Sequence, residues 1–226
     1  MNILLVAGGK KQTWPSLKKY DKYIGIDRGS FYLLEEDLPL DFAIGDFDSL
    51  SSEERERVRQ NAKNFFQAPA EKDDTDTQLA LLMAIEHFPN AKIDIIGATG
   101  GRIDHFLANL WIVLEKRFQP FAHNISLLDK QNVIRFFLPG KYSVRKEKGM
   151  KYLAYCCLTP IDNLSLMESK YLLENVKVEH PTSFASNEFI TDEASFIFET
   201  GIIAVIQSKD SETVKSLFLF LKISES

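Results

Sequence analysis

Cysteine and long apolar runs are both scarce in this sequence. The chain of 226 residues has two cysteines, the adjacent Cys156 and Cys157. Adjacent cysteines rarely form a disulfide without strain, and two are too few for a structural zinc site, so we expect a reduced, cytoplasmic protein. No run approaches the roughly 18 apolar residues of a membrane span. The apolar run at 3–7 lacks the basic segment of a signal peptide and predicts a buried strand.

An excess of positive charge is also absent. Lys and Arg number 27 against 32 Asp and Glu, which gives a net charge of −5. This balance argues against a nucleic-acid-binding protein that relies on phosphate contacts, and an anionic substrate would need a local cationic patch or a metal ion. The composition, 45% hydrophobic and 26% charged, excludes wholesale disorder, and the length allows one large domain or two small ones.

Several common catalytic motifs are missing. The chain has 4 histidines, and none of them forms an H-x-x-x-H or H-E-x-x-H pattern, which argues against a catalytic zinc. The absence of a G-x-S-x-G elbow argues against an α/β-hydrolase. Neither G-x-G-x-x-G nor a Walker A loop is present, so neither a Rossmann dinucleotide site nor a P-loop is supported.

The first half of the chain alternates short apolar runs with helical patterns. The apolar runs each stop at Gly or Asp, and they are 3–7, 23–26, 42–44 and 93–96. The helical segments are 30–36, 52–61, 75–87 and 105–118. Such alternation predicts a parallel sheet covered on both faces, and ligands bind such sheets beyond the carboxyl ends of the strands.

The pattern changes near residue 125. Short strand-like runs separated by turn signals follow, at 125–128, 133–138, 141–145, 152–158, 172–178, 195–199 and 202–207. Helical patterns are scarce there. We therefore predict an α/β N-terminal domain with a parallel sheet over residues 1–124, followed by an all-β sandwich domain over residues 125–226.

Aspartates gather at the predicted strand ends and helix starts. They are Asp27, Asp46, Asp48, Asp73, Asp74, Asp76 and Asp104. Asp46 and Asp48, two residues apart in an extended chain, would point to the same side. Carboxylates that converge on one rim repel one another, and Mg²⁺, which binds carboxylates and substrate phosphates, would relieve that repulsion. Helix capping at 73–75 and an Asx turn at 45–49 are the simpler alternatives for single segments, but the recurrence at one rim favours a metal site.

A glycine-rich segment supplies an anion site at the same rim. In Gly97-x-x-Gly100-Gly101-Arg102, glycines after a strand allow close approach of a phosphate, and the N-terminus of the following helix favours negative charge. Basic residues beside the same strand ends are Arg102, Arg28, Lys72 and Lys10, of which Lys10 is best interpreted as a solvated surface residue. His105 follows Asp104, and Asn109 lies on the same helix face.

Four of these segments resemble, in order and spacing, the signature of the thiamine pyrophosphokinase family. They are Ile26-Asp-Arg-Gly29, Ile44-Gly-Asp-Phe-Asp-Ser49, Lys72-Asp-Asp-Thr-Asp76, and Gly97-Ala-Thr-Gly-Gly-Arg-Ile-Asp-His105 with Asn109. In the second half, Ser186-Asn187-Glu188 resembles an element near the thiamine site of that family. The segment 182–185 differs from the family there, because it lacks the glycine that shortly precedes the element.

The resemblance implies transfer of a pyrophosphoryl group from ATP to the hydroxyethyl oxygen of thiamine, giving thiamine diphosphate and AMP. It also implies a nucleotide-binding α/β domain, a β-sandwich that binds thiamine, and a homodimer with active sites at the subunit interface, with no nucleic-acid or membrane partner. On this basis, the catalytic residues are Asp46, Asp48, Asp73 and Asp104, and the Mg²⁺ ligands are Asp46, Asp48 and Asp73. The nucleotide and its phosphates contact Asp27, Arg28, Lys72, Asp76, Gly100, Gly101, Arg102 and His105, and thiamine contacts Ser186 and Asn187.

Two other functions compete with this interpretation. Asp46-Phe-Asp48-Ser-Leu50 superficially resembles the D-x-D-x-[TV] loop of a Mg²⁺-dependent phosphohydrolase with an aspartyl nucleophile. That loop normally follows the first strand and is accompanied by a later lysine motif, whereas here it follows the third predicted strand. A non-catalytic nucleotide sensor is the other alternative, but a sensor needs no cluster of metal-binding carboxylates.

Overall fold

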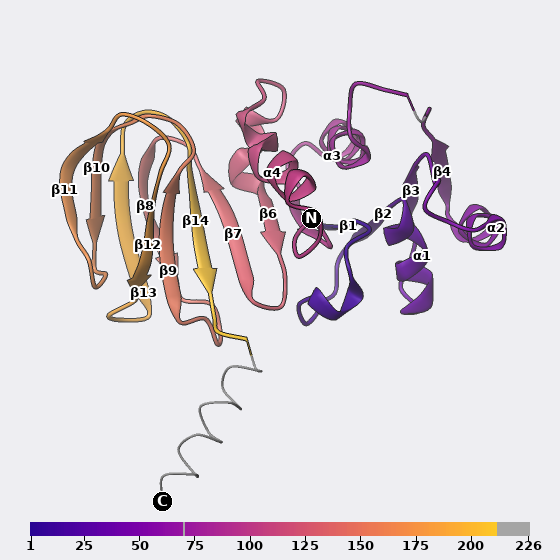
Figure 1. The fold of residues 1–226 in the computed structure, drawn as a ribbon, viewed down its shortest axis with the longest axis horizontal. Coiled ribbons are helices and arrows are strands. Elements are labelled where there is room, and N and C mark those ends of the chain that lie inside the picture. The colour runs from indigo at the N-terminus through magenta and orange to yellow at the C-terminus, as the bar shows by residue number, and fades with distance from the viewer. Residues whose placement is uncertain (70, 212–226) are drawn as a thin grey trace, which may run out of the picture. The chain divides into compact units, whose positions relative to one another are not determined.

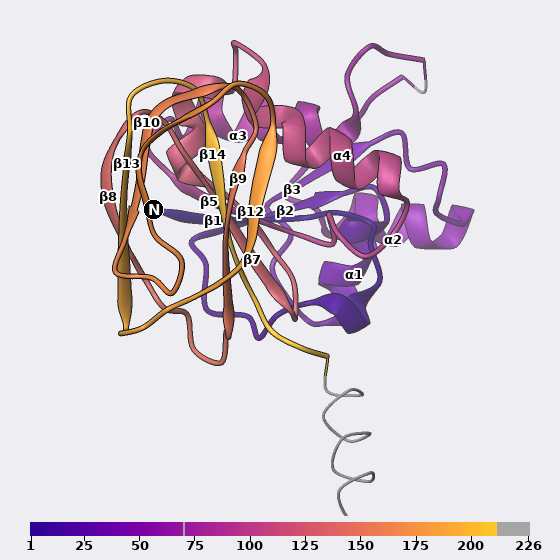
Figure 2. The same ribbon diagram turned by 60° about the vertical axis from the view of Figure 1, so that its left-hand side comes forward.

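The computed structural model describes residues 1–69 and 71–211, which form two compact units (Figures 1 and 2). The first unit is Met1–Lys130, and the second begins at Gln131. The first therefore extends a few residues beyond 124, because β6 (Ile125–Leu128) pairs in parallel with β5 (Lys92–Ile96). Residues 125–128, which we assigned to the β domain, thus belong to the parallel sheet.

The first unit is built on a parallel sheet in the order β6-β5-β1-β2-β3-β4. Besides β5 and β6, its strands are β1 (Asn2–Val6), β2 (Lys22–Ile26), β3 (Phe42–Gly45) and β4 (Asn64–Gln67). Ile3, Leu4 and Leu5 of β1 have no exposed surface, as expected for a strand covered on both faces. The expected parallel sheet is confirmed.

The direction of the strand order reverses beside β1. From β1 the chain proceeds to β2, β3 and β4 on one side, and then crosses to β5 and β6 on the other. In open sheets of this kind, the crevice at the carboxyl ends of the two strands that flank the reversal is the usual ligand site. Here those strands are β1 and β5, and their ends carry glycines.

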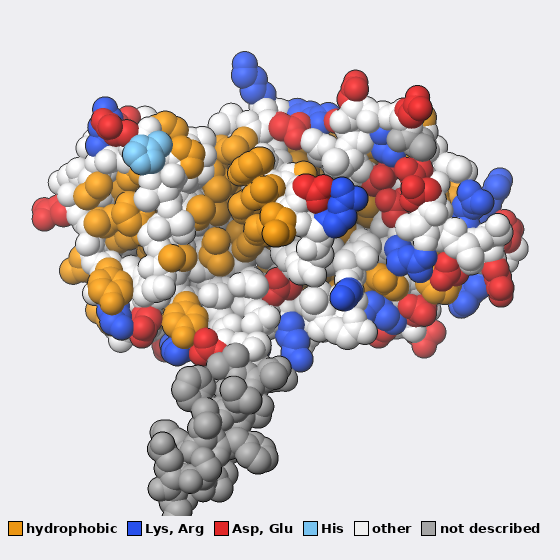
Figure 3. Space-filling view, in the orientation of Figure 1, with side chains coloured by type: hydrophobic (Ala, Val, Ile, Leu, Met, Phe, Trp, Pro, Cys, Tyr) orange, Lys and Arg blue, Asp and Glu red, His pale blue; other side chains and the backbone are white. Residues whose placement is uncertain are grey.

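The helices of the first unit start within two residues of the predicted positions, but one of them ends early. They are α1 (Arg28–Glu35), α2 (Ser52–Asn61), α3 (Asp76–His87) and α4 (Ile103–Trp111). Capping boxes fix the starts of α2 and α3, through the side chains of Ser51 and Thr75. The helix predicted over 105–118 ends at Trp111, because residues 112–114 tighten into a 3₁₀ turn that buries the β-branched Ile112 and Val113. In Figure 3, charged side chains of both signs cover the region of α2, whose sequence is almost wholly polar.

The second unit is the predicted β-sandwich. Antiparallel pairs connect its strands in the orders β12-β9-β14-β7 and β11-β10-β13-β8. The strands are β7 (Asn132–Phe137), β8 (Gly140–Arg145), β9 (Tyr152–Cys157), β10 (Ile161–Met167), β11 (Leu173–Val178), β12 (Thr182–Glu188), β13 (Glu193–Phe198) and β14 (Ile203–Ser208). Alternate side chains of both layers meet in one core that includes Tyr155, Phe196 and Phe198.

Three strands have no counterpart in the sequence analysis. They are β4, β10 and β12. β4 is short and largely exposed, β10 contains the turn-like pair Asp162-Asn163, and β12 is mostly polar. Among the described helices, none combines the length and the apolar character that a membrane crossing requires.

Candidate active site

A cleft of about 660 Å³ opens at the carboxyl ends of β1, β2, β3 and β5. Its lining includes the residues that follow these strands, together with the starts of α3 and α4. The residues that line it include Gly9, Asp27, Arg28, Asp46, Asp48, Lys72, Asp74, Asp76, Thr99, Gly101, Arg102, His105 and Asn109. The predicted convergence of the acidic and glycine-rich segments at this edge is therefore observed.

Two glycines let the loops after β1 and β5 touch. The Gly9 N–H donates to the Gly97 carbonyl oxygen at 3.0 Å. A Cβ on Gly9 would lie 2.3 Å from that same oxygen, and one on Gly97, whose φ is +68°, would lie 2.4 Å from the Ala7 carbonyl oxygen. Neither position admits a larger residue without movement of the backbone. The floor of the crevice thus depends on both glycines.

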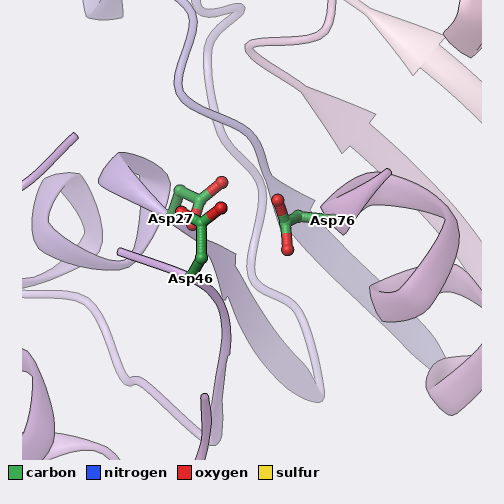
Figure 4. Close-up of side chains that lie close together, drawn as sticks. All are labelled: Asp27, Asp46 and Asp76. Atoms are coloured by element: carbon green, nitrogen blue, oxygen red, sulfur yellow. The ribbon is translucent and has the colours of Figure 1, made fainter. Parts of the chain in front are cut away.

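Three carboxylates form a tight cluster at one side of the cleft. Asp27, Asp46 and Asp76 each offer an oxygen within 4.8 Å of the others. Figure 4 shows Asp27 and Asp46 side by side, with Asp76 facing them from the start of α3. In Figure 3 acidic side chains gather in the corresponding region, between α3 and β3.

The backbone beside Asp27 is shaped to place its carboxylate. Asp27 has a φ of 47°, which is rare for a residue with a side chain. Its Oδ1 accepts a hydrogen bond from the Phe47 N–H at 3.1 Å. A Cβ added to Gly45 would lie only 1.9 Å from the same oxygen. Glycine at position 45, with a φ of +149°, therefore makes room for this carboxylate. Such local strain is typical of functional sites.

The cluster carries more negative charge than its surroundings neutralise. Burial, together with the carboxylates of Asp76 and Asp46, raises the pKa of Asp27 to about 7, although the Phe47 N–H opposes this shift. The Lys72 ammonium group lies 3.0 Å from Asp76 Oδ1 and 3.7 Å from Asp46 Oδ2. Burial lowers the pKa of Lys72, but the neighbouring carboxylates outweigh this effect and the net direction is upward.

The cluster fits a hard divalent cation. Its potential ligands are all carboxylate oxygens, the ligand type that Mg²⁺ prefers. Asp76 Oδ1 is buried, and its neighbour among the described residues is the Lys72 ammonium group at 3.0 Å, an ion pair whose geometry falls short of a hydrogen bond. A buried carboxylate oxygen is destabilising unless a positive charge lies against it, and both the Lys72 ammonium group and a divalent cation would meet that need.

Asp48 lies at the cleft but not in the cluster. The expectation that Asp46 and Asp48 share one side of an extended strand is wrong, because β3 ends at Gly45 and Phe47 has a φ of 59°. The Asp48 N–H donates to Asp46 Oδ1 at 3.0 Å, an Asx turn. Asp48 is exposed, so it faces the open part of the cleft.

Asp73 and Asp104 lie outside the lining of the cleft. Asp73 is exposed, and Asp104 forms an exposed ion pair with Arg102 at 2.6 Å. Asp74, to which we assigned no role, does line the cleft, where Arg117 binds both its oxygens at 2.5 and 2.9 Å.

The start of α4 forms one side of the cleft. Gly101, Arg102 and His105 line it, and Arg102 stands at the N-cap with no side-chain hydrogen bond to the first turn within the described structure. The first turn of α4 thus offers N–H groups to an anion, apart from that of His105, whose hydrogen bond the Asp104 carboxylate accepts. Gly100 has a φ of +73° and packs beside Thr13 rather than on the cleft surface.

Two buried polar side chains hold the loop between β5 and α4. Thr99 donates to Asp129 Oδ2 at 2.6 Å, and Asn109 Nδ2 donates to the Ala98 carbonyl oxygen at 3.2 Å. Arg28, on the opposite wall, contacts Glu54 at 3.3 Å and donates to the Ser49 carbonyl oxygen. Thr99 and Asp129 have no role predicted from the sequence, and their sequence signal is their place three residues after β5 and directly after β6.

Ser186 and Asn187 occupy a bulge in β12 of the second unit. The register with β9 shifts between Phe184 and Asn187, and Ser186 has a φ of 62°. Ser186 is exposed, whereas Asn187 is buried. The Asn187 amide is fully used within the chain: its oxygen accepts from two backbone N–H groups, including that of Tyr171, and its nitrogen donates to Ser169 Oγ and to the Tyr171 carbonyl oxygen.

Comparison with known families finds two matches that together cover most of the chain. Residues 13–128 match the family described as "Thiamin pyrophosphokinase, catalytic domain". Residues 141–203 match "Thiamin pyrophosphokinase, vitamin B1 binding domain". The first match contains the whole acidic cluster, and the second contains the bulge at Ser186.

Individual relatives agree with these matches. A thiamine pyrophosphokinase of Bacillus subtilis is 38% identical over 216 residues, which are 92% of this chain and 99% of the relative. The crystal structure of a thiamin pyrophosphokinase family protein from Enterococcus faecalis is 58% identical, with a TM-score of 0.92, over 93% of this chain and 100% of that one. Yeast thiamin pyrophosphokinase, at 15% identity and a TM-score of 0.71 over 92% of this chain and 86% of its own, shares the fold.

Proposed function

The chain belongs to the thiamin pyrophosphokinase family, and from this membership we propose that it transfers a pyrophosphoryl group from ATP to thiamine, giving thiamine diphosphate and AMP. The observation that carries the proposal is the cluster of Asp27, Asp46 and Asp76 in a cleft at the reversal of the strand order. Phosphoryl-type transfer depends mainly on positioning and on neutralising the oxygen charges, and this cleft contains groups for both.

Asp27, Asp46 and Asp76 are the residues that would hold Mg²⁺. When bound, the ion would supply neutralisation of the negative charge on the polyphosphate oxygens. Asp46 keeps the ligand role assigned from the sequence, while Asp27 and Asp76 join it because their oxygens converge with its own. For Asp48, which is close by, and for the exposed Asp73 and Asp104, we propose contacts with a bound substrate rather than ligation in the free protein.

The phosphates of ATP would bind between the start of α4 and the basic side chains of the cleft. The N–H groups after Arg102, with Gly101 beside them, favour phosphate oxygens. Arg28 and Lys72 add positive charge at the carboxylate side, and His105 lies in the first turn of α4. Because attack occurs at the β-phosphorus and AMP leaves, these groups must hold the β-phosphate so that the thiamine hydroxyl lies opposite the bridging oxygen to the α-phosphate. One carboxylate of the site would accept the proton of that hydroxyl.

For the second unit, we propose thiamine binding and assembly. Exposed Ser186, turned outward by the bulge, is available to hydrogen-bond the aminopyrimidine ring, whereas buried Asn187 holds the bulge in shape. We also propose a homodimer, as the family resemblance implies; C₂ dimers are the commonest homo-oligomers. A cytoplasmic location fits the two free cysteines, Cys156 and Cys157.

One assay separates the proposed activity from its alternatives. The protein is incubated with ATP and Mg²⁺, with and without thiamine, and AMP and inorganic phosphate are measured. AMP that forms only with thiamine supports the kinase. Phosphate release without thiamine would instead identify a phosphohydrolase, and no turnover would identify a nucleotide sensor.

Asp46→Asn tests the cluster directly. Loss of one preorganised electrostatic group typically lowers the rate by about 10²–10³. Glu86→Gln, which removes one negative charge from the exposed end of α3, is the matched control and should retain wild-type turnover. Equal turnover of Asp46→Asn and Glu86→Gln at limiting Mg²⁺ would remove Asp46 from the site.

A further inference from the structure

We propose that Lys72 competes with the divalent cation for the acidic cluster, so that the cation binds tightly only together with an anionic substrate that draws the ammonium group away. This inference rests on the proposed function and adds a regulation of metal binding to it. It concerns the binding of Mg²⁺ to the nucleotide-free protein, which an assay of the reaction does not measure.

The position of Lys72 carries the argument. Its Nζ lies 3.0 Å from Asp76 Oδ1 and 3.7 Å from Asp46 Oδ2, two of the three carboxylates in the cluster. The side chain is only 14% exposed, so this is an ion pair shielded from water rather than a surface contact. A cation bound by the oxygens of Asp46 and Asp76 would therefore have the ammonium group as an immediate neighbour.

Two positive groups so close together in a partly dry site repel each other strongly. A pair of unit charges at about 4 Å interacts by several kcal/mol even at an effective dielectric constant of ~20, and Mg²⁺ has twice that charge. The cation can enter only if the ammonium group leaves. Leaving has a cost of its own, because the ion pair with Asp76 is lost.

Within the described structure, the polar contacts of the Lys72 side chain are all made by its Nζ. The residue precedes the cap of α3 at Thr75, and besides its two carboxylate neighbours, Nζ donates a hydrogen bond to the Pro69 carbonyl oxygen at 2.9 Å. Its flexible stem and compact charge allow it to exchange a carboxylate for a phosphate. The other basic residues of the cleft have partners elsewhere: Glu54 for Arg28 and Asp104 for Arg102.

A polyphosphate would change this balance. It offers oxygens that can bind the ammonium group and the cation at the same time. Lys72 and the cation then no longer compete for the same carboxylates. The carboxylates then bind the divalent cation in place of the Lys72 ammonium group. Lys72 stabilises the bound substrate instead of blocking the metal. Free Mg²⁺ should thus bind weakly to the wild-type protein.

The test is calorimetric titration of nucleotide-free protein with MgCl₂. Lys72→Met keeps the stem and removes the charge, and we expect a Kd for Mg²⁺ at least about tenfold lower than that of the wild type. Lys18→Met is the control, since it removes the same charge from a residue that is 61% exposed and paired with Asp94. It should change the Kd by less than about twofold. Lys72→Gln provides the same comparison with a side chain that still forms hydrogen bonds.

A double variant locates the effect. Adding Asp46→Asn to Lys72→Met should abolish the gain, because the extra affinity depends on the cluster. An unchanged or higher Kd in both Lys72 variants would overturn the inference, while thiamine-dependent AMP formation by the wild type would leave the proposed function standing. A gain that survives Asp46→Asn would also overturn it, since the cation would then bind elsewhere.

Discussion

Gly9→Ala tests whether the contact between the loops after β1 and β5 supports both fold and site. The added Cβ would lie 2.3 Å from the Gly97 carbonyl oxygen and 2.8 Å from its carbon. Both atoms belong to the backbone, and the backbone of Gly97 is itself confined by a φ of +68° and by close approach to Ala7. No side chain can rotate away, so the two loops must separate by about 1 Å to reach ordinary contact.

The cost follows from two effects. Overpacking of a well-packed site typically costs 1–3 kcal/mol, and separation of the loops breaks the hydrogen bond from Gly9 N–H to Gly97, worth about 1 kcal/mol. We expect Gly9→Ala to lower the free energy of unfolding by about 2–4 kcal/mol. Urea unfolding at constant slope measures this loss.

Gly101→Ala is the matched control in the same cleft. A Cβ there meets no atom within 4 Å, so the stability should stay within about 0.5 kcal/mol of the wild type. The same Cβ projects from a residue that lines the cleft, and we expect it to raise the KM for ATP by obstructing phosphate. If Gly9→Ala unfolds at the same urea concentration as Gly101→Ala, the steric reasoning about the crevice is refuted.

Three further predictions concern stability. Tyr155→Phe should stabilise the second unit by about 1 kcal/mol in urea unfolding, because the Tyr155 hydroxyl is buried without a hydrogen-bond partner in the described structure; a loss would show that the hydroxyl is satisfied. Asn187→Ala should destabilise by about 2–4 kcal/mol, because it leaves the Tyr171 N–H without its acceptor, and a change confined to the KM for thiamine would contradict this. Burial raises the pKa of Asp41, but Lys63, the Tyr23 N–H and Lys22 outweigh it and hold the pKa below its usual value. Asp41→Asn should therefore cost about 1.5–3 kcal/mol at pH 7, and the difference from wild type should shrink as the pH falls below the ordinary Asp pKa of about 4; a pH-independent difference would refute the assignment.

The parallel sheet could be predicted because its strands are covered on both faces. β1, β2, β3 and β5 are mostly apolar, with Asp94 as an exception inside β5, and a Gly or Asp follows each within two residues. Burial on both faces removes the alternation of apolar and polar residues that marks a half-buried strand. The short length of the apolar runs, and the Gly or Asp at their ends, indicate the strands instead. β4 lacks the signal, because it is the last strand in the order and mostly exposed.

β10 and β12 are irregular, and this is why their strands escaped prediction. The register of β10 with β11 shifts twice, and Asn163 within β10 has a φ of 54°. β12 has its bulge at Ser186, so its side chains do not follow a period of two. A bulge appears in sequence as a polar, turn-like segment, and only the pairing with a neighbouring strand shows that the chain continues through it.

The choice among the aspartates depends on backbone angles that residue spacing does not contain. A spacing of two, as in Asp46 and Asp48, predicts a shared side only if the chain between them is extended. The positive φ of Phe47 breaks that condition, and the positive φ of Asp27 turns a residue at the start of α1 back over Gly45. Asp76 is selected by the capping box at Thr75, which makes it the first residue of α3 and aims it at the other two. The residue composition at the strand ends thus predicts an acidic site. Which aspartates belong to it depends on three local conformations, each stabilised by a hydrogen bond or by the absence of a Cβ.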